Sequence, residues 1–368
     1  MLNALTINDP VTPEWLTLAL RDAGALPTGE VIAVEARVNS AFNSAAAHLA
    51  VTYSDDAPSD APQALFLKRN LPVGWAIESG RDEVAFYRTM APHYARLPML
   101  IPCYATLIDE ARGASTLLMP DVSATHAPPL LRDDQIAGRS IPHTTALAQA
   151  IDALATFHAA WWERPELGDA FPIIPWYRDA EHFAAHAERR QGEWERFIAA
   201  EGDWFPADLR VFYEREIARF PRLWENGLGE RITSRSGLTL THGDCYLTQF
   251  LCPRPGIVAP TYLVDFQSAG ADLIGSDLTH MFAFCWTREQ RQEGGREELA
   301  LRRYHAGLLA GGVRDYGWDD LLTTYRLALT IMLFYPVWDE TNGSPRDYWL
   351  PKLQNTVAAY QDHCLAGD

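Results

Sequence analysis

Two stretches of this sequence place an aspartate directly after a strand-like run: Leu240-Thr241-His242-Gly243-Asp244 and Tyr262-Leu263-Val264-Asp265-Phe266-Gln267. Short apolar runs that lead into turn-forming residues are typical of buried strands. The two aspartates lie 21 residues apart, and this spacing predicts a hairpin that brings both carboxylates to one cleft. Ionised carboxylates at close range repel each other, and a metal ion between them would relieve the repulsion. The alternative is that each aspartate only caps a turn.

The chain before residue 120 has the pattern of a β-rich region. Residues 31–38 and 46–53 alternate between apolar and polar side chains, which is the period of a strand. Turn-forming residues join these two strands at positions 39–44. A helix predicted at 80–90 follows. Further strands are predicted at 64–68, 101–108 and 115–119.

Helical periodicity dominates the chain beyond residue 120. Apolar side chains fall on one helix face from 147 to 161. Long helical segments are also predicted at 180–198, 207–225, 289–309, 318–333 and 348–363. We therefore expect an α+β fold of two lobes. A small β-rich lobe with one internal helix would span residues 1–120, and a larger, mainly helical lobe would span residues 121–368.

Composition argues against several classes of protein. The formal net charge of −17 repels nucleic-acid backbones. No apolar run approaches the roughly 18 residues that a membrane helix needs, and the acidic Asp9 and Glu14 do not fit a secretory signal. The five cysteines are scattered and include no C-x-x-C pair. This usage argues against a disulfide framework or a zinc site and favours a reducing cytoplasm.

Phosphoryl transfer requires a cation on the phosphates and carboxylates for the metal and for the attacking hydroxyl. Lys68 ends an apolar strand, and an inward-facing ammonium would need an anionic partner. Glu83, on the following predicted helix, is suitably placed to supply it. The alternative for Lys68 is a surface lysine at a strand end. We interpret His242 and His158 as structural histidines rather than as a base or metal ligands.

The residues around the two aspartates resemble the signature of the aminoglycoside phosphotransferase and choline kinase-like superfamily. That signature comprises His242-Gly243-Asp244, Gln249, Leu263-Val264-Asp265-Phe266-Gln267 and Asp277. Residues 83–88 and 154–162 look closest to the ecdysteroid-kinase-like branch and to related bacterial phosphotransferases. The similarity runs in order from about residue 31 to residue 280. It implies a protein-kinase-like bilobal fold and an ATP-dependent and Mg²⁺-dependent transfer to a hydroxyl.

The resemblance also implies roles for single residues. Asp244 would orient or deprotonate the acceptor hydroxyl, and Asp265 would be the main Mg²⁺ ligand. Lys68 would bind the α- and β-phosphates, with Glu83 holding its ammonium. Asp277 would brace the catalytic loop rather than touch the substrate.

The remaining implied contacts concern the nucleotide. Ser40, Asn43 and Ser44 would lie in the loop that covers the phosphates. Adenine would be read by backbone groups after Met119, namely the carbonyl of Pro120 and the N–H of Val122.

Two departures from the family pattern bear on catalysis. Gln249 stands where the family usually has asparagine, so the side chain of the second metal ligand is one methylene longer. This difference bears on metal binding because Mg²⁺ requires a strict octahedral geometry. The segment 39–44 contains no glycine, which restricts its backbone near phosphates. Three readings stay open: a kinase, a nucleotide-binding protein of weak activity, and a metal-dependent hydrolase using His242, Asp244 and Asp265. Replacing Lys68 would separate the first from the third.

The acceptor is expected to be a small molecule that carries a hydroxyl. The region from 161 to 230 is rich in tryptophan, tyrosine and acidic residues. Aromatic walls suit a polycyclic alcohol or a cationic amine, and the acidic residues would attract a cation. The alternatives are that the aromatic residues form core and that the acidic residues form a solvated helix face. The sequence indicates no oligomeric state.

Overall fold

The computed structural model of the chain describes residues 2–40 and 44–365 and separates into two units. The first unit comprises Met1–Ala127 and Leu251–Ala269. The second comprises Pro128–Phe250 and Gly270–Asp368. The first contains an antiparallel sheet and the second is mainly helical, so the predicted α+β architecture is confirmed.

Five antiparallel strands form the main sheet of the first unit, in the order β1-β2-β3-β5-β4. Their bounds are Val31–Ser40 (β1), Ser44–Tyr53 (β2), Ala64–Asn70 (β3), Ala105–Asp109 (β4) and Ala114–Pro120 (β5). The central strand β3 carries Lys68, which pairs in register with Ala46 of β2 and Leu117 of β5. The lysine is therefore fixed by strands on both sides.

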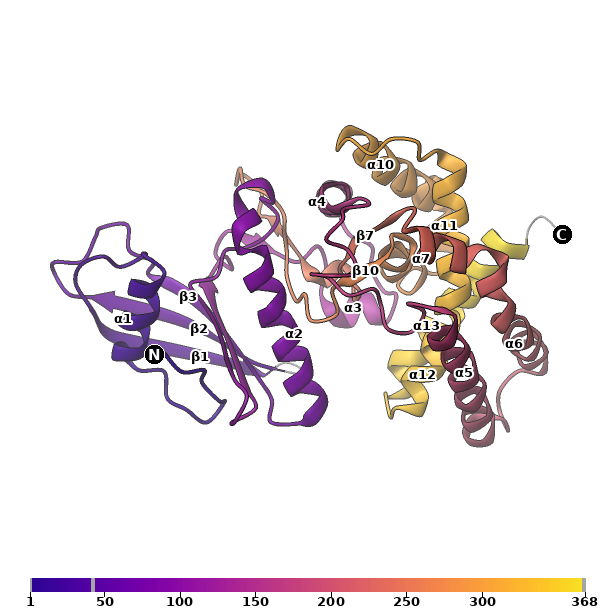
Figure 1. Ribbon diagram of the computed structural model, residues 1–368, viewed down its shortest axis with the longest axis horizontal. Coiled ribbons are helices and arrows are strands. Elements are labelled where there is room, and N and C mark those ends of the chain that lie inside the picture. Colours follow the sequence, from indigo (N-terminus) through magenta and orange to yellow (C-terminus); the bar gives the residue numbers. More distant parts are fainter. Residues whose placement is uncertain (1, 41–43, 366–368) are drawn as a thin grey trace. The chain divides into compact units, whose positions relative to one another are not determined.

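The two faces of this sheet carry different side chains. Leu65 and Leu67 of β3 are fully buried in a core cluster that also contains Leu16 and Leu20 of helix α1 (Pro13–Asp22). Side chains alternate along a strand, so Lys68 points to the opposite face. Helix α2 (Gly74–Met90) packs there, and Figure 1 shows α1 and α2 on either side of the strands.

Local sequence explains how both helices are placed. Thr12 caps α1 by accepting a hydrogen bond from Trp15 N–H, and a proline occupies the first turn. Gly80 lets α2 approach β5 closely, since a Cβ atom at this position would clash with the side chains of Ser115 and Asn70. This close approach brings Glu83, one turn further along α2, to the sheet.

A second sheet has the order β6-β8-β9, with bounds His126–Ala127, Phe250–Pro253 and Tyr262–Leu263. Leu263 forms a parallel bridge with Leu100, and its N–H donates to the carbonyl of Met99. Asp265 follows β9 after one residue. The segment Leu251–Ala269, although late in the chain, thus carries Asp265 into the first unit.

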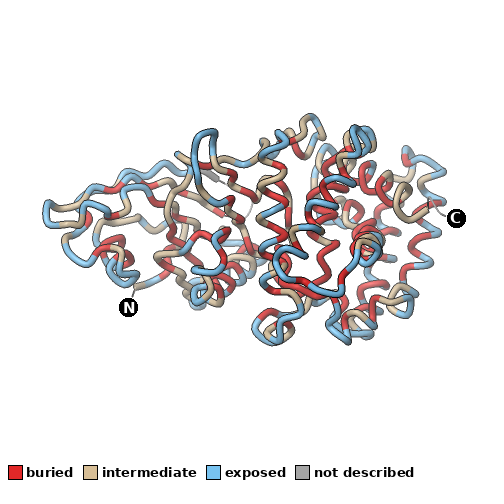
Figure 2. Tube along the Cα trace, turned by 90° about the horizontal axis from the view of Figure 1, so that it is seen from above, coloured by how far each residue is buried: buried red, intermediate tan, exposed pale blue. Residues whose placement is uncertain are grey.

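The second unit is built from helices around one antiparallel strand pair, β7 (Leu238–Thr241) and β10 (Gly270–Leu273). Among its described residues the helices before β7 are α3 (Arg132–Ile136), α4 (Thr144–Trp161), α5 (Ala180–Glu201), α6 (Ala207–Arg219) and α7 (Gly229–Ser234). Those after β10 are α8 (Gly275–Leu278), α9 (Arg288–Gln292), α10 (Arg296–Ala310), α11 (Trp318–Met332), α12 (Tyr335–Thr341) and α13 (Arg346–Tyr360). Figure 2 shows buried stretches along most of these helices.

One segment among the described residues, Trp318–Thr341, is long and apolar enough to cross a membrane. It comprises α11 and α12, and 61% of its apolar window is buried within the protein. Because most of this apolar window is buried, the segment has the hydropathy expected of the core of the second unit.

Candidate active site

Lys68 lies between two carboxylates in the first unit. Its Nζ atom is 2.7 Å from Oε2 of Glu83 and 2.5 Å from Oδ1 of Asp265. Burial alone would lower the pKa of this lysine, but the charges of Asp265 and Glu83 outweigh it and raise the pKa above the ordinary value. The Lys68 ammonium therefore stays protonated near neutral pH, and two carboxylates hold it in place.

Asp265 reaches Lys68 from a left-handed backbone conformation. Its φ of 73° is rarely adopted by residues other than glycine and is costly unless the surroundings enforce it. The next residue supplies that enforcement, because Phe266 stacks on Phe86 of α2 with ring centroids 4.1 Å apart and planes at 9°. Tyr87 packs edge-on against the same ring. The helix that carries Glu83 thus also anchors Asp265.

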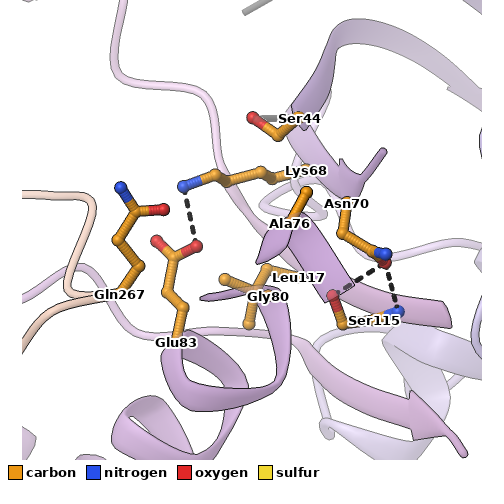
Figure 3. A pocket seen from close by; sticks show the side chains of 9 residues that line it. All are labelled: Ser44, Lys68, Asn70, Ala76, Gly80, Glu83, Ser115, Leu117 and Gln267. Atoms are coloured by element: carbon orange, nitrogen blue, oxygen red, sulfur yellow. Dashed lines mark hydrogen bonds and ion pairs between the residues drawn. The ribbon is translucent and has the colours of Figure 1, made fainter. Parts of the chain in front are cut away.

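A small pocket surrounds the Lys68 ammonium within the first unit (Figure 3). Glu83 and Gln267 point toward it, and Asn70 and Ser115 form its far wall. The Asn70 side-chain oxygen accepts hydrogen bonds from the N–H and the hydroxyl of Ser115, at 2.7 and 3.0 Å. The pocket is lined by Ser44, Lys68, Asn70, Ala76, Gly80, Glu83, Ser115, Leu117 and Gln267.

The predicted phosphate loop is only partly described. Ser44 begins β2, is buried and lines the pocket. Asn43 lies outside the described residues, as does the side chain of Ser40, whose backbone ends β1.

The segment predicted to read adenine follows β5. Pro120 ends that strand, and the N–H of Asp121 donates a hydrogen bond to the carbonyl of Ala64. Val122 follows directly, and its carbonyl accepts the N–H groups of Thr125 and His126. The Asp121 carboxylate pairs with Nδ1 of His48 at 2.6 Å, a contact that the sequence did not reveal.

Asp244 lies in the second unit, in the loop after β7, and its side chain is 32% exposed. The preceding Gly243 has a φ of 78°, which suits glycine and lets the chain turn sharply. Nε2 of His280 is 3.9 Å from Oδ1 of Asp244. Burial lowers the pKa of His280 to about 4, so this ring is neutral near pH 7.

Asp277 fixes the backbone of the same loop. Its fully buried carboxylate accepts the N–H groups of His242 at 2.7 Å and Gly243 at 2.9 Å. Nε2 of His158 donates to it at 3.0 Å, and Nδ1 of His158 contacts the hydroxyl of Tyr304 at 2.5 Å. Burial favours the neutral acid, but the bond from His158 and the charges nearby outweigh it, so the pKa of Asp277 is lowered. These contacts match the predicted bracing role, and His158 has the expected structural one.

Gln249 ends a short 3-10 helix, Leu247–Gln249, in the second unit. Its N–H donates to the carbonyl of Tyr246 at 2.9 Å, which closes the turn after Asp244. Its predicted role as a metal ligand stays a prediction.

The donor chemistry of the first unit fits a magnesium nucleotide. Asp265 offers carboxylate oxygens, which Mg²⁺ prefers, and one of them already holds a cation in the form of the Lys68 ammonium. Among residues 2–40 and 44–365, no group of three histidine, cysteine, aspartate or glutamate side chains is placed to hold a metal. In proteins Mg²⁺ is usually held by one or two carboxylates together with substrate phosphates.

Sequence reasoning missed a second buried lysine. The chain contains two lysines and 29 arginines, and the second lysine, Lys352, pairs with Asp339 at 2.7 Å in the second unit. The rarity of lysine was the available signal. The partner was not predictable, because Asp339 lies on another helix.

Comparison with known proteins gives a consistent result. The model of the phosphotransferase enzyme family matches residues 54–322. Among solved structures, a choline kinase from Cryptosporidium parvum superposes with a TM-score of 0.57 at 9% identity, covering 89% of each chain.

Two further structures are similar. An aminoglycoside phosphotransferase from Alicyclobacillus acidocaldarius gives a TM-score of 0.52 at 14% identity, covering 96% of this chain and 93% of its own. An ethanolamine kinase from Plasmodium vivax gives 0.50 at 9% identity, covering 90% and 82%. At such identities the similarity is one of fold. The comparison with curated proteins finds no significant match.

Proposed function

Since this chain belongs to the phosphotransferase enzyme family, we propose that it transfers the γ-phosphate of ATP to a hydroxyl group of a small molecule. The observation that carries the proposal is the position of Lys68, held between Glu83 and Asp265 on the central strand of the sheet. This arrangement gives the lysine a role that the hydrolase alternative does not require.

Phosphoryl transfer depends mainly on positioning and on charge neutralisation, because its transition state is loose. In the proposed reaction Lys68 binds phosphate oxygens of the nucleotide, and Glu83 keeps its ammonium in place. Asp265 would hold Mg²⁺, which when bound neutralises charge on the phosphates. Gln249 is proposed as the second metal ligand.

Asp244 is proposed to act on the acceptor. As the hydroxyl oxygen forms its bond to phosphorus and the bond to the nucleoside diphosphate breaks, the hydroxyl proton passes to the Asp244 carboxylate. The aspartate can do this because Asp277 holds the backbone of its loop through the N–H groups of His242 and Gly243. Nε2 of His280 lies 3.9 Å from Oδ1 of the same carboxylate.

The remaining proposed contacts concern the nucleotide base and phosphates. Ser44 lines the pocket around Lys68, and the backbone groups of Pro120 and Val122 follow the strand β5. We propose that Ser40, Asn43 and Ser44 cover the phosphates and that adenine is read at Pro120 and Val122.

The test is ATP turnover by the purified protein with Mg²⁺ against a panel of alcohols, aminoglycosides and sterols. Asp244→Asn, which keeps the shape of the side chain, should lower transfer by about 10²–10⁴-fold, the usual contribution of a general base. The exposed Asp208→Asn is the matched control and should leave turnover unchanged. Saturable ATP binding with no transfer to any acceptor would favour the nucleotide-binding alternative, and Gln249→Asn would then be the first change to make.

A further inference from the structure

Lys352 is an unusual use of lysine in this chain. The chain has only two lysines, against 29 arginines. Lys352, on α13, is buried, with 7% of its side chain exposed. An ammonium is a compact point charge, whereas a guanidinium is a planar fork, so the two side chains suit differently shaped sites. The site around residue 352 therefore suits a small, nearly spherical cation.

The surroundings of Lys352 have the chemistry of a cation-binding cage. Its Nζ atom lies 4.2 Å from the ring centre of Tyr348, 5.1 Å from that of Phe284 and 5.5 Å from that of Tyr246. It also donates hydrogen bonds to Oδ2 of Asp339 at 2.7 Å and to the Tyr348 hydroxyl at 3.1 Å. Three aromatic rings and a carboxylate are the groups that bind quaternary ammonium ligands in proteins.

The cage formed by Tyr246, Phe284 and Tyr348 lies beside Asp244. Tyr246 follows that aspartate by two residues in the same loop. His280, whose Nε2 is 3.9 Å from Asp244, packs edge-on against the rings of Tyr246 and Phe284, with centroids 5.3 and 5.0 Å apart. One wall of the cage thus continues into the surroundings of the proposed catalytic carboxylate.

Stability alone does not explain the Lys352–Asp339 pair. Desolvating two charges often costs as much as their attraction returns, and apolar residues of similar volume can replace such pairs without loss. Although burial would lower the pKa of Lys352, the Asp339 carboxylate raises it above the ordinary value. The lysine accordingly remains charged inside the cage.

We propose that Lys352 determines the acceptor class: its ammonium fills the cage beside Asp244, so the acceptor presents an uncharged, hydroxyl-bearing group there rather than a cationic amine. This inference rests on the proposed function and makes it more specific. A second cation about 4 Å from the ammonium would be disfavoured on the order of 10³-fold at an effective dielectric constant of about 20.

The test is a calorimetric titration with tetramethylammonium chloride, which requires neither nucleotide nor turnover. The wild-type protein should show no binding at millimolar probe, because the cage is full. Lys352→Ala removes the internal cation and leaves three rings and the Asp339 carboxylate, so it should bind the probe in the millimolar range. Lys352→Ser likewise removes the cation and leaves room in the cage, and it serves as a second variant if Lys352→Ala does not fold.

Two results would overturn the inference: binding of tetramethylammonium by the wild type as tightly as by the variants, or no binding by a variant whose circular dichroism is native. Turnover gives an independent readout with two isosteric alcohols, choline and its neutral carbon analogue 3,3-dimethylbutan-1-ol. Loss of Lys352 should shift the ratio of their kcat/KM values toward choline by at least 10-fold, and an unchanged ratio would count against the inference. Absence of transfer to these alcohols and to every acceptor of the panel above, with the binding result intact, would count against the proposed function alone.

Discussion

The two lysines of this protein occupy opposite kinds of charge environment. Lys68, in the first unit, is shared by two carboxylates, whereas Lys352, in the second unit, has one carboxylate and an aromatic cage. The first cluster has two carboxylates for one ammonium, whereas the second has one carboxylate for its ammonium. The second is already neutral. A buried lysine can therefore belong to a site that is prepared for a ligand or to one that its own side chain completes.

This comparison predicts its largest effect at the single carboxylate of the second site. Asp339→Asn leaves the buried Lys352 ammonium without an anion, and breaking a buried pair costs about 3–5 kcal/mol. Urea unfolding should show this loss in the free energy of unfolding. A loss below 1 kcal/mol would mean that the aromatic rings alone stabilise the Lys352 ammonium. The Asp339 carboxylate would then not be the group that distinguishes this site from that of Lys68.

Removal of Lys68 tests the first site through turnover. Lys68→Met should lower phosphate transfer by about 10²–10³-fold, the usual effect of deleting one preorganised donor to developing charge. The exposed Arg222→Met is the control for loss of one positive charge. Transfer at the wild-type rate in a folded Lys68→Met protein would contradict the proposed role.

Removal of one of the two carboxylates of Lys68 should cost less than removal of Asp339. In Glu83→Gln the ammonium keeps Asp265, so the expected loss is about 1 kcal/mol of unfolding free energy, similar to one hydrogen bond. Turnover should fall as well, because the lysine is then less firmly placed. If Glu83→Gln destabilises the protein as much as Asp339→Asn, the second carboxylate does not compensate for the first.

The smallest expected effect is a loss of stability in acid. It arises in the second unit, where the buried His186 and His280 have lowered pKa values. Burial lowers the pKa of His186 to about 3 and that of His280 to about 4. Between these values and about 6.5 the unfolded chain binds more protons than the folded one, so stability is lost as the pH falls through this window. Each histidine should cost about 1 kcal/mol between pH 6.5 and 5.5.

Asp272 contributes to the pH dependence of stability with the opposite sign. Burial raises its pKa to about 6, so stability is lost as the pH rises from about 4 to 6.

Because His186 contributes to the loss of stability in acid, His186→Gln should flatten the acid side of a plot of unfolding free energy against pH. An unchanged slope in this variant would show that His186 is protonated in the folded state.

Local sequence patterns predicted the strand that carries Lys68 and the helix that carries Glu83. The strand ending near Lys68 and the helix carrying Glu83 were both expected, and the contact between the two side chains is present. The helix begins at Gly74 rather than at residue 80. Ala76 is the one buried residue of its first turn, and the close packing that requires Gly80 is a tertiary effect. The helix predicted at 289–309 is divided at Gly294 and Gly295, whose φ angles are positive.

Contacts between distant segments were not predictable in the same way. The contact between Lys68 and Asp265 joins residues 197 positions apart, and it exists because residues 251–269 belong to the first unit. The cage around Lys352 draws on Tyr246, Phe284 and Tyr348, which share no periodicity. Such groupings depend on tertiary packing, on which a single sequence carries little information.

The scarcity of lysine has a practical consequence. The side chains of Lys68 and Lys352 are 16% and 7% exposed and both amines are engaged in ion pairs, so lysine-directed reagents meet little reactive amine on the native protein. Guanidinium groups supply the remaining side-chain cations, apart from any protonated histidines. Amine labelling measured separately at Lys68 and at Lys352, apart from the α-amine of the chain, should consequently report on opening of the fold, with one reporter in each unit. ATP should shield only the first of them, which makes the same reagent a probe of nucleotide occupancy that needs no acceptor.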